Sequence, residues 1–241
     1  MPVDVVTLFP SVFVGPLEDG MLARARRSGR FGVRVHDLRR FGVGAHRQVD
    51  DAPYGGGAGM VLRPEPLFEA VDWIRRAYPA APDRVVLLSP QGERFDHRQA
   101  RRLAGYARVI LLCGRYEGVD ERVREALADE ESSVADVVLT GGEVPALLVL
   151  DGLARFLPGV LGHPRAAEED SFEGGQLEHP HWTRPALYRG MEVPEVLLSG
   201  NHEAIARWRE RRSVLATRNK RPDLLRGAGH GEAEPDRADK G

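Results

Sequence analysis

Short runs of hydrophobic residues alternate with amphipathic segments along the first two thirds of the chain. The runs are apolar at consecutive positions and rich in Val, Ile and Leu, a pattern typical of parallel strands that are covered on both faces. We expect such strands at residues 3–9, 84–88, 108–112 and 135–139, and a further strand at residues 33–38, where apolar and polar positions alternate. Amphipathic segments at 66–78, 96–104 and 119–128 predict helices, and Ser11 is placed to cap another helix that ends near Arg27. This alternation predicts an α/β fold with a mostly parallel sheet.

The pattern changes beyond Leu157. Residues 158–185 have few periodic hydrophobic positions and many Gly, Pro, His and acidic residues, which indicates a linker followed by an irregular stretch. Residues 201–212 have the pattern of a strongly basic helix that opens with an Asn cap. Residues 226–241 are Gly-rich and charged, which predicts a disordered tail. We therefore place a domain boundary near residue 160.

Composition excludes several classes of function. The 241 residues are 42% hydrophobic and 29% charged, which is ordinary for a globular protein, and the net charge of −2 does not by itself predict a polyanionic partner. Cys113 is the single cysteine, so neither an internal disulfide nor a Cys-rich zinc site is possible, which fits a reducing cytoplasm. The lysines are Lys220 and Lys240, which excludes a P-loop, a Schiff-base lysine within the fold and a protein kinase.

No targeting or membrane segment is expected. Asp4 stands where a signal peptide needs basic residues. The most apolar stretch, residues 144–161, is interrupted by Asp151, Arg155 and two prolines, so it falls short of a membrane span.

Three of the predicted strands are followed by loops that contain glycine. These loops are residues 89–92 (SPQG), 113–118 (CGRYEG) and 140–143 (TGGE). In open α/β sheets ligands bind outside the carboxyl ends of the strands, where glycines let the backbone approach a ligand. The alternative is that the glycines only turn the chain between strand and helix. No G-x-G-x-x-G follows a strand, so the dinucleotide fingerprint is missing.

The most unusual stretch is residues 50–60 (DDAPYGGGAGM), with four glycines in five positions. It is either a flexible linker or a loop shaped around a ligand, such as a lid. Acids, a Tyr and a Met flank the glycines inside an otherwise folded domain, which favours the second interpretation.

Single polar residues give weaker indications. Arg155 is most simply interpreted as an arginine at a helix end, with the aliphatic part of its side chain covering apolar surface. Residues 168–171 (EEDS) are most simply interpreted as a run of solvated charges. His202 and Glu203 begin like a zinc protease motif, but position 206 is Ala, and His179 with His181 is thin support for a metal pair. No G-x-S-x-G is present for a hydrolase.

Positive charge is clustered although the net charge is small. One group lies beside Trp182 and Trp208 and comprises Arg207, Arg209, Arg211, Arg212, Arg218, Lys220 and Arg221. A second group comprises Arg24, Arg26, Arg27, Arg30, Arg34, Arg39, Arg40 and Arg47. Arginine with aromatic residues suits RNA, because guanidinium groups bind phosphate and flat side chains stack on bases. The alternative is that these arginines are ordinary solvated surface.

Several strings, taken together and in order, resemble the bacterial tRNA (guanine-N1)-methyltransferases. The strings are residues 7–10 (TLFP), 49–60 (VDDAPYGGGAGM), 88–92 (LSPQG), 113–120 (CGRYEGVD), 155–163 (RFLPGVLGH), 169–172 (EDSF) and 190–202 (GMEVPEVLLSGNH). The resemblance extends over residues 7–225, and the ordered combination is far more specific than any one string.

The resemblance implies a SPOUT-superfamily α/β domain with a trefoil knot and a small helical C-terminal domain. It implies methyl transfer from S-adenosylmethionine to N1 of the guanine at tRNA position 37, 3′ of the anticodon, by a cytoplasmic homodimer with its sites at the interface. The corresponding regions are a knotted S-adenosylmethionine-binding domain (1–161), a linker (162–176), a helical tRNA-binding domain for the anticodon stem-loop (177–226) and a disordered tail (227–241).

The resemblance also assigns residues. Asp170 matches the general base that removes the N1 proton, and Arg155 matches the cation that stabilises charge on guanine O6. Family members are reported to use Mg²⁺, to which Glu117 is a candidate contributor, although nothing in the sequence alone calls for a metal. The implied cofactor contacts are Leu88, Ser89, Pro90, Gly114, Tyr116, Glu117, Val134, Ala135, Asp136, Val137, Val138, Leu139, Gly141 and Gly142.

The third cofactor loop departs from the family pattern. Ala135 replaces a usual Gly, Val137 replaces a common aromatic residue, and Ser132-Ser133 lacks a frequent bulky residue. A methyl at position 135 would crowd a ligand if the backbone there needed a positive φ. Two rival hypotheses follow: a non-catalytic RNA-binding paralogue, and a knotted methyltransferase that acts on another base or RNA.

Overall fold

The computed structural model describes residues 1–79, 82–162 and 170–226. Its contacts divide the chain into two compact units, Met1–Pro164 and Arg165–Gly241. Residues 163–169 of the predicted linker and the whole predicted tail at 227–241 lie outside the described residues. Within the described ranges, no helix combines the length and the apolar character that crossing a membrane requires.

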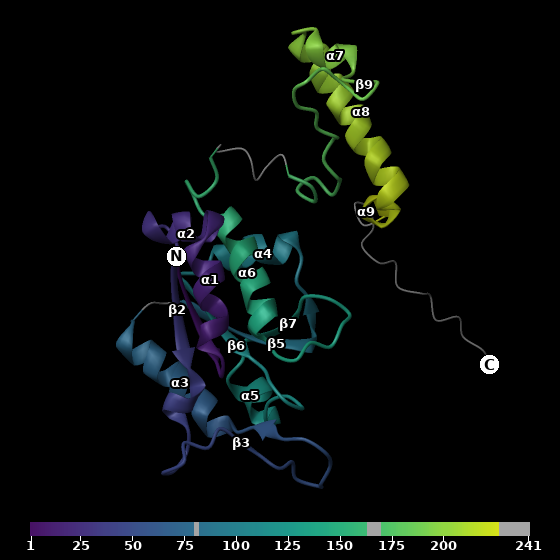
Figure 1. The fold of residues 1–241 in the computed structure, drawn as a ribbon. Coiled ribbons are helices and arrows are strands. Elements are labelled where there is room, and N and C mark those ends of the chain that lie inside the picture. The colour runs from purple at the N-terminus through teal and green to yellow at the C-terminus, as the bar shows by residue number, and fades with distance from the viewer. Residues whose placement is uncertain (80–81, 163–169, 227–241) are drawn as a thin grey trace, which may run out of the picture. The chain divides into compact units, whose positions relative to one another are not determined.

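A five-stranded sheet forms the centre of the first unit, in the order β2-β1-β6-β5-β7 (Figure 1). All four strand pairings are parallel, which confirms the predicted α/β fold with a mostly parallel sheet. The strands are β1 (Pro2–Thr7), β2 (Gly32–Asp37), β5 (Asp83–Arg94), β6 (Arg108–Cys113) and β7 (Glu130–Ser133). Every residue of the central strand β6 is buried, as its unbroken apolar run predicts.

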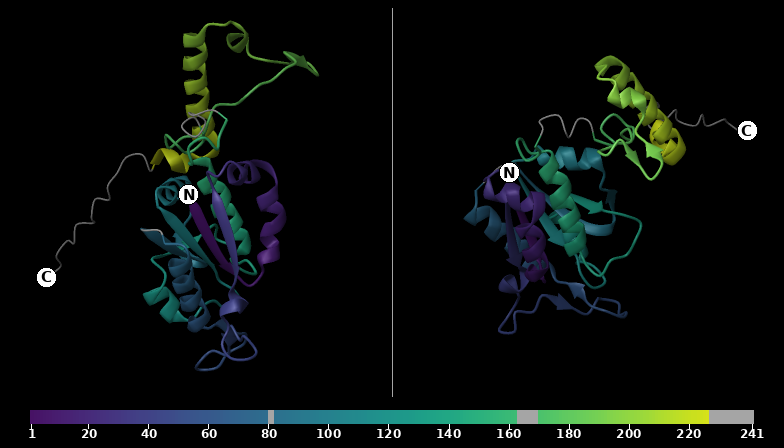
Figure 2. Two further views of the ribbon diagram at one scale, coloured as in Figure 1. Left: turned by 90° about the vertical axis from the view of Figure 1, so that its left-hand side faces the viewer. Right: turned by 45° about the horizontal axis from the view of Figure 1, so that its top comes forward.

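Helices cover both faces of this sheet (Figure 1 and Figure 2). Successive strand residues point to opposite faces, so Val109 and Leu111 join one core cluster while Ile110 and Leu112 join the other. The first face carries α1 (Val14–Glu18), α2 (Gly20–Arg27), α4 (His97–Ala104) and α6 (Glu143–Arg155). The second face carries α3 (Pro64–Ala77) and α5 (Glu121–Ala126).

Two predictions about the elements were wrong. The helix expected over residues 11–27 is interrupted, because Asp19 is extended and Gly20 has a φ of 63°, a left-handed conformation that glycine adopts without strain. It becomes a 3-10 turn, η1 (Pro10–Phe13), followed by α1 and α2. The strand expected at 135–139 is instead an irregular segment, and the polar residues just before it form the edge strand β7.

The strand β5 carries an irregularity that positions the site. Ser132 of β7 pairs with Leu88 and also with Glu93, so residues 89–92 bulge away from the sheet. A second small sheet pairs β3 (Asp50–Asp51) with β4 (Val61–Leu62) and brackets the glycine-rich loop between them. A 3-10 turn, η2 (Leu38–Phe41), follows β2.

The second unit contains one long helix, α8 (His202–Lys220). The Asn201 side chain accepts a hydrogen bond from the Ala204 N–H at 3.1 Å, so the predicted cap is confirmed and the helix extends past the predicted end at 212. Before α8 come the hairpin β8 (Leu187–Tyr188) and β9 (Met191–Glu192) and the short α7 (Glu195–Leu198); α9 (Pro222–Arg226) follows it. The Thr217 hydroxyl accepts a hydrogen bond from the Leu177 N–H at 2.9 Å, which ties residue 177 to this helix.

Candidate active site

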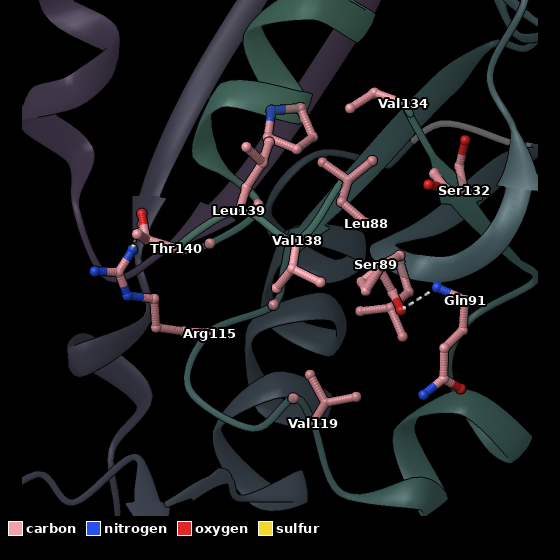
Figure 3. A pocket seen from close by; sticks show the side chains of 18 of the residues that line it. Leu88, Ser89, Gln91, Arg115, Val119, Ser132, Val134, Val138, Leu139 and Thr140 are labelled. Carbon is pink, nitrogen blue, oxygen red and sulfur yellow. Dashed lines mark hydrogen bonds between the residues drawn. The ribbon is translucent and has the colours of Figure 1, made fainter. Parts of the chain in front are cut away.

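The carboxyl ends of β5, β6 and β7 open onto one pocket of about 210 Å³ (Figure 3). Its walls include residues of all three glycine-bearing loops that the sequence singled out. Of the residues that the resemblance assigns to a cofactor, the pocket is lined by Leu88, Ser89, Pro90, Gly114, Tyr116, Glu117, Val134, Ala135, Val137, Val138, Leu139, Gly141 and Gly142. The structure brings these residues together around one hollow.

The first wall is the bulge of β5. The Ser89 hydroxyl accepts a hydrogen bond from the Gln91 N–H at 3.1 Å, which shapes the tight turn (Figure 3). Gly92 returns the chain to β7 so closely that a Cβ there would overlap the Ser132 backbone nitrogen. The bulge therefore needs glycine at position 92 for a close approach of two backbones.

The second wall is the loop after β6. Tyr116 has a φ of 60°, unusual for a residue with a side chain. Burial raises the pKa of its hydroxyl, and the Asp50 carboxylate raises it further by charge and by a hydrogen bond. The Glu117 N–H donates to the Met60 carbonyl at 3.1 Å, and a Cβ on Gly59 would lie 2.5 Å from Glu117 Oε1. The end of the glycine-rich loop thus packs against this wall.

The third wall is the irregular segment 134–142. Its apolar side chains are exposed, with Val137 at 52% and Val138 at 82%, and both line the pocket. The hydrophobic run at 135–139, which suggested a strand, therefore lines the pocket and does not pack in the core. In the described part of the chain the non-glycine residues with positive φ are Arg47, Tyr116, Phe172 and Arg189. Ala135 is not among them, so its methyl group needs no strained backbone.

Segment 134–142 ends against the loop after β6. The Gly142 N–H donates to the Gly114 carbonyl at 2.9 Å, and a Cβ on Gly142 would lie 2.6 Å from Cys113 Cα. Gly141 forms an antiparallel bridge with Arg115. Two loops that are distant in sequence thus meet backbone to backbone, which only glycine allows at position 142.

A carboxylate lies directly behind this contact. Glu143, the first residue of α6, is 5% exposed and accepts a hydrogen bond from the Thr7 hydroxyl at 2.8 Å. Arg115 Nη1 lies 3.7 Å from Glu143 Oε2 and donates to Thr140 Oγ1 at 3.4 Å. Burial, and then the negative charge of Glu143, raise the pKa of the Cys113 thiol well above its ordinary value.

Several pocket residues were not predicted. Arg115 and Thr140 stand inside the glycine-bearing loops and could have been chosen for that reason, as could Gln91 in the first loop. Arg124 comes from α5 and Pro145 from α6, and no local pattern in the sequence marks either of them. Ser132 and Ser133 line the pocket because β7 ends there. Asp136 has an exposed side chain and is not among the lining residues, so its cofactor contact stays a prediction.

The two predicted catalytic residues lie in different units. Arg155 is the last residue of α6 in the first unit and is half-buried. Asp170 belongs to the second unit, is half-buried, and its carbonyl accepts a hydrogen bond from the Glu173 N–H at 3.4 Å. Glu168 and Glu169 of the same acidic run lie outside the described residues. The roles of Arg155 and Asp170 stay predictions.

The two basic groups differ in how their charges are used. In the first group Arg34 forms an ion pair with the buried Asp4 at 2.7 Å, and Arg24 donates to the Val160 carbonyl at 2.6 Å, so part of this group stabilises the fold. On α8, Arg209 and Arg211 are exposed, and Arg212 lies over the Trp208 ring at 5.6 Å. The Trp208 and Trp182 rings are 5.3 Å apart, so the aromatic residues do gather beside the basic helix.

A metal centre finds no support among the described residues. Within residues 1–79, 82–162 and 170–226, no cluster of three or more His, Cys, Asp or Glu side chains could hold an ion. The His179 and His181 rings are 4.5 Å apart, and His181 Nε2 lies 3.2 Å from Glu178. Glu117 borders the pocket without such a cluster, so no step below is assigned to Mg²⁺.

Comparison with known proteins places this architecture in a family. The family model described as tRNA (Guanine-1)-methyltransferase TrmD matches residues 1–227. A tRNA (guanine-N(1)-)-methyltransferase of Geobacter sulfurreducens is 51% identical over 228 residues, which cover 95% of this chain and 92% of the relative. Proteins of the same name from Pelotomaculum thermopropionicum and Geobacillus kaustophilus are 52% and 49% identical, covering 95% and 93% of this chain and 91% of each relative. The chain therefore belongs to the tRNA (guanine-N1)-methyltransferase family, which is a family of enzymes.

Proposed function

We propose that this enzyme transfers a methyl group from S-adenosylmethionine to N1 of the guanine at position 37 of tRNA. The observation that carries the proposal is the pocket at the carboxyl ends of β5, β6 and β7, where ligands bind in open parallel sheets. Two of its walls, the 89–92 bulge and the loop after β6, lie in strings in which the sequence resembles the family.

The lining of the pocket fits the methyl donor. Leu88, Val137, Val138 and Leu139 offer apolar surface that a flat adenine and an aliphatic chain can cover, and backbone groups at Ser89 and Gly114 can bind its polar atoms. The carboxylate of Glu117 and the guanidinium of Arg115 supply opposite charges for a zwitterionic amino-acid end. When bound, S-adenosylmethionine supplies a methyl group on a positively charged sulfur.

Asp170 and Arg155 are proposed to prepare the guanine. N1 of guanine carries a proton and is a poor nucleophile until that proton leaves. We assign the proton to the Asp170 carboxylate, which acts as general base. Loss of the proton places negative charge on O6, and we assign the Arg155 guanidinium to stabilise it.

We further propose the trefoil knot that the resemblance implies. Two features support it: segment 134–142 runs from β7 into α6 with Gly142 pressed against Cys113 and Gly114, and β7 pairs with β5 on both sides of the 89–92 bulge. Ordinary chains avoid threading of this kind, so it would be a special feature of the cofactor loops.

The enzyme is proposed to act as a homodimer. Val12 of η1, Val14 of α1, and Val144 and Leu148 of α6 are apolar and exposed, between 39% and 60%. η1 contacts α6, so these side chains gather on neighbouring elements beside the pocket loop. A second copy of the chain would cover such a surface, as the resemblance implies for sites at a dimer interface.

We assign tRNA binding to residues 177–226 and a linking role to residues 162–176. The support is the exposed arginines of α8 beside the Trp182–Trp208 pair, a combination that binds phosphate and stacks on bases. We also propose that the enzyme acts in the cytoplasm, because a bacterial member of this family would meet its tRNA substrate there.

The test is transfer of labelled methyl from S-adenosylmethionine to unmodified tRNA transcripts that carry guanine or adenine at position 37. Label with the guanine transcript alone is expected, together with 1-methylguanosine in the digested product. Equal label in both transcripts would favour a methyltransferase for another base. No label with either transcript, from folded protein, would favour the non-catalytic paralogue.

A further inference from the structure

Glu143 is a charged residue that the proposed chemistry does not use. Its carboxylate is buried at the base of the pocket, yet no step of the proposed transfer uses it. A buried carboxylate is costly unless it is paired and hydrogen-bonded. What it contacts therefore indicates what it is for.

Both carboxylate oxygens of Glu143 have a partner in the protein. The Thr7 hydroxyl donates to Glu143 Oε1 at 2.8 Å and accepts from the Phe9 N–H at 2.9 Å. On the other side Arg115 approaches Glu143 Oε2 at 3.7 Å, and its guanidinium lies 4.6 Å from the centre of the Phe9 ring. These contacts join the end of β1, the loop after β6 and the start of α6. Glu143 also occupies the first turn of α6, where the helix dipole favours a negative charge.

Gly141 lies between the two charged side chains. A Cβ at this position would overlap Glu143 Oε2 and lie 2.7 Å from Arg115 Nη1. Arg115 also donates to the neighbouring Thr140 hydroxyl, and the two side chains face each other at the pocket wall (Figure 3). The Arg115–Glu143 pair thus closes over the backbone of residues 140–141, which line the pocket.

We propose that Glu143 is a positioning residue for the pocket. It holds Arg115 over Gly141 and thereby fixes segment 134–142 against the loop after β6 in the conformation that binds the methyl donor. The part that concerns donor affinity rests on the proposed function. Without the carboxylate charge the segment samples other conformations, and the apparent affinity falls with the fraction that remains competent to bind.

The first experiment measures the dissociation constant of S-adenosylmethionine by titration calorimetry. Glu143→Gln keeps the shape of the side chain and removes its charge, so the Kd is expected to rise about tenfold, the usual worth of a charged hydrogen-bonded contact. Thr7→Val removes the hydroxyl and keeps both charges, and a rise of about threefold is expected. Should Glu143→Gln fail to fold, Thr7→Val carries the comparison.

The matched control is Asp83→Asn. Asp83 also pairs with a buried arginine, since its Oδ2 lies 2.8 Å from Arg108 Nη2, but this pair is at the amino ends of the strands. The control is expected to lower the melting temperature at least as much as Glu143→Gln while the Kd changes by less than about twofold. An equal rise of Kd in the control would overturn the proposal, because any loss of stability would then explain it.

Cys113 gives a readout that needs no ligand. Its side chain is buried, and the backbone of Gly142 passes directly over it. Loosening of segment 134–142 is expected to speed labelling of Cys113 by a thiol reagent at least about tenfold in Glu143→Gln, and not in Asp83→Asn, well below both melting temperatures. Because removal of the Glu143 charge also lowers the pKa of the Cys113 thiol, the deciding variant is Thr7→Val, which keeps that charge and is expected to speed labelling as well. If the wild-type protein bound no donor, the proposed function would fail, and this labelling would still decide whether Glu143 holds the segment.

A double-mutant cycle separates positioning from direct binding by Arg115. Arg115→Gln and Glu143→Gln are expected to be non-additive in Kd, because each alone breaks the same pair. Additive effects, or a Glu143→Gln variant with wild-type Kd and wild-type labelling of Cys113, would contradict the proposal. Arg115→Lys is expected to restore less than the full affinity, because an ammonium lacks the flat face with which the guanidinium lies over the Phe9 ring.

Discussion

Both ends of the parallel sheet contain an arginine–carboxylate contact in which one partner is buried, and the two contacts have different surroundings. At the amino ends of β5 and β6, Arg108 is fully buried and pairs with Asp83, which Arg75 also binds at 3.0 Å. Burial opposes ionisation of Asp83, but the hydrogen bonds from Arg75 and Arg108 outweigh it and hold its pKa below the ordinary value. Arg108 also donates to the Tyr78 carbonyl at the end of α3, so the contact joins a helix to the sheet.

At the carboxyl ends the contact between Arg115 and Glu143 borders a hollow. Arg115 is partly exposed on the pocket wall, and the chain beside it is glycine at 141 and 142. The same pair of chemical groups therefore has two uses in one domain. Where helices and strands enclose it, it joins the elements of the core; where glycine-bearing loops border it, we propose that it shapes a binding site.

The largest effect is expected from a substitution of the proposed general base, which should lower the rate of methyl transfer without changing binding of the methyl donor. Asp170→Asn is expected to lower methyl transfer at least a hundredfold, on the order of the contribution of a general base, because the amide cannot take the N1 proton. The Kd for S-adenosylmethionine should stay within about twofold of the wild type, because the proposed role of Asp170 is toward the guanine and not toward the methyl donor. The measurements are single-turnover transfer and titration calorimetry. Transfer at the wild-type rate would exclude Asp170 as the base.

A substitution at the amino ends of β5 and β6 should change the stability of the protein and not its affinity for the methyl donor. Arg108→Ala leaves the Asp83 carboxylate without its buried partner and is expected to reduce the free energy of unfolding by about 3 kcal/mol. Urea unfolding followed by fluorescence measures this loss. The donor Kd, measured where the variant is folded, should be unchanged. A loss below about 1 kcal/mol would show that the Arg108–Asp83 pair stabilises no more than a surface pair does.

Substitution of an exposed apolar residue of the pocket should change the affinity for the methyl donor and not the stability of the protein. Val138→Asp places a charge on a wall that the ligand would cover, so the Kd is expected to rise about twentyfold, equivalent to ~2 kcal/mol. The free energy of unfolding should change by less than about 0.5 kcal/mol, because Val138 is 82% exposed. Leu187→Asp, at an exposed apolar residue of the second unit, is the control and should leave the Kd unchanged. Similar Kd values for both variants would place the ligand elsewhere.

The smallest effect is expected at position 135. Because Ala135 lies outside the left-handed region, Ala135→Gly relieves no strain, and the donor Kd should change by less than about twofold. Added freedom of the unfolded chain should cost about 0.5–1 kcal/mol of unfolding free energy. Calorimetry and urea unfolding measure the two quantities. A gain in affinity above about fivefold would mean that the methyl group crowds the ligand.

The sequence predicted the sheet well where apolar runs fill the core, as in β6. It failed at 135–139 because exposed valines that line a pocket have the same composition as buried strand residues. The edge strand β7 was missed because backbone pairing with β5, and not an apolar face, holds the polar Glu130–Ser133 in place. The break at Gly20 also escaped, since no local pattern shows that this glycine adopts a positive φ.

The pocket was predicted in part for a physical reason. Glycine loops after parallel strands must meet at one edge of the sheet, so residues such as Ser89, Gly114 and Gly142 could be expected to lie together. The role of Glu143 could not be expected, because its partners Thr7 and Arg115 are distant in sequence and only the fold joins them. Resemblance to a family, and not spacing, supplied the assignments of Asp170 and Arg155.

The central claim is that the carboxyl ends of β5, β6 and β7 hold the methyl donor. The most direct measurement is a crystal structure of the protein grown with S-adenosylmethionine. We expect the adenosyl group to lie between the 89–92 bulge, the loop after β6 and segment 134–142, with Arg115 still paired to Glu143. A donor bound elsewhere, or an empty pocket in crystals grown well above the measured Kd, would contradict it.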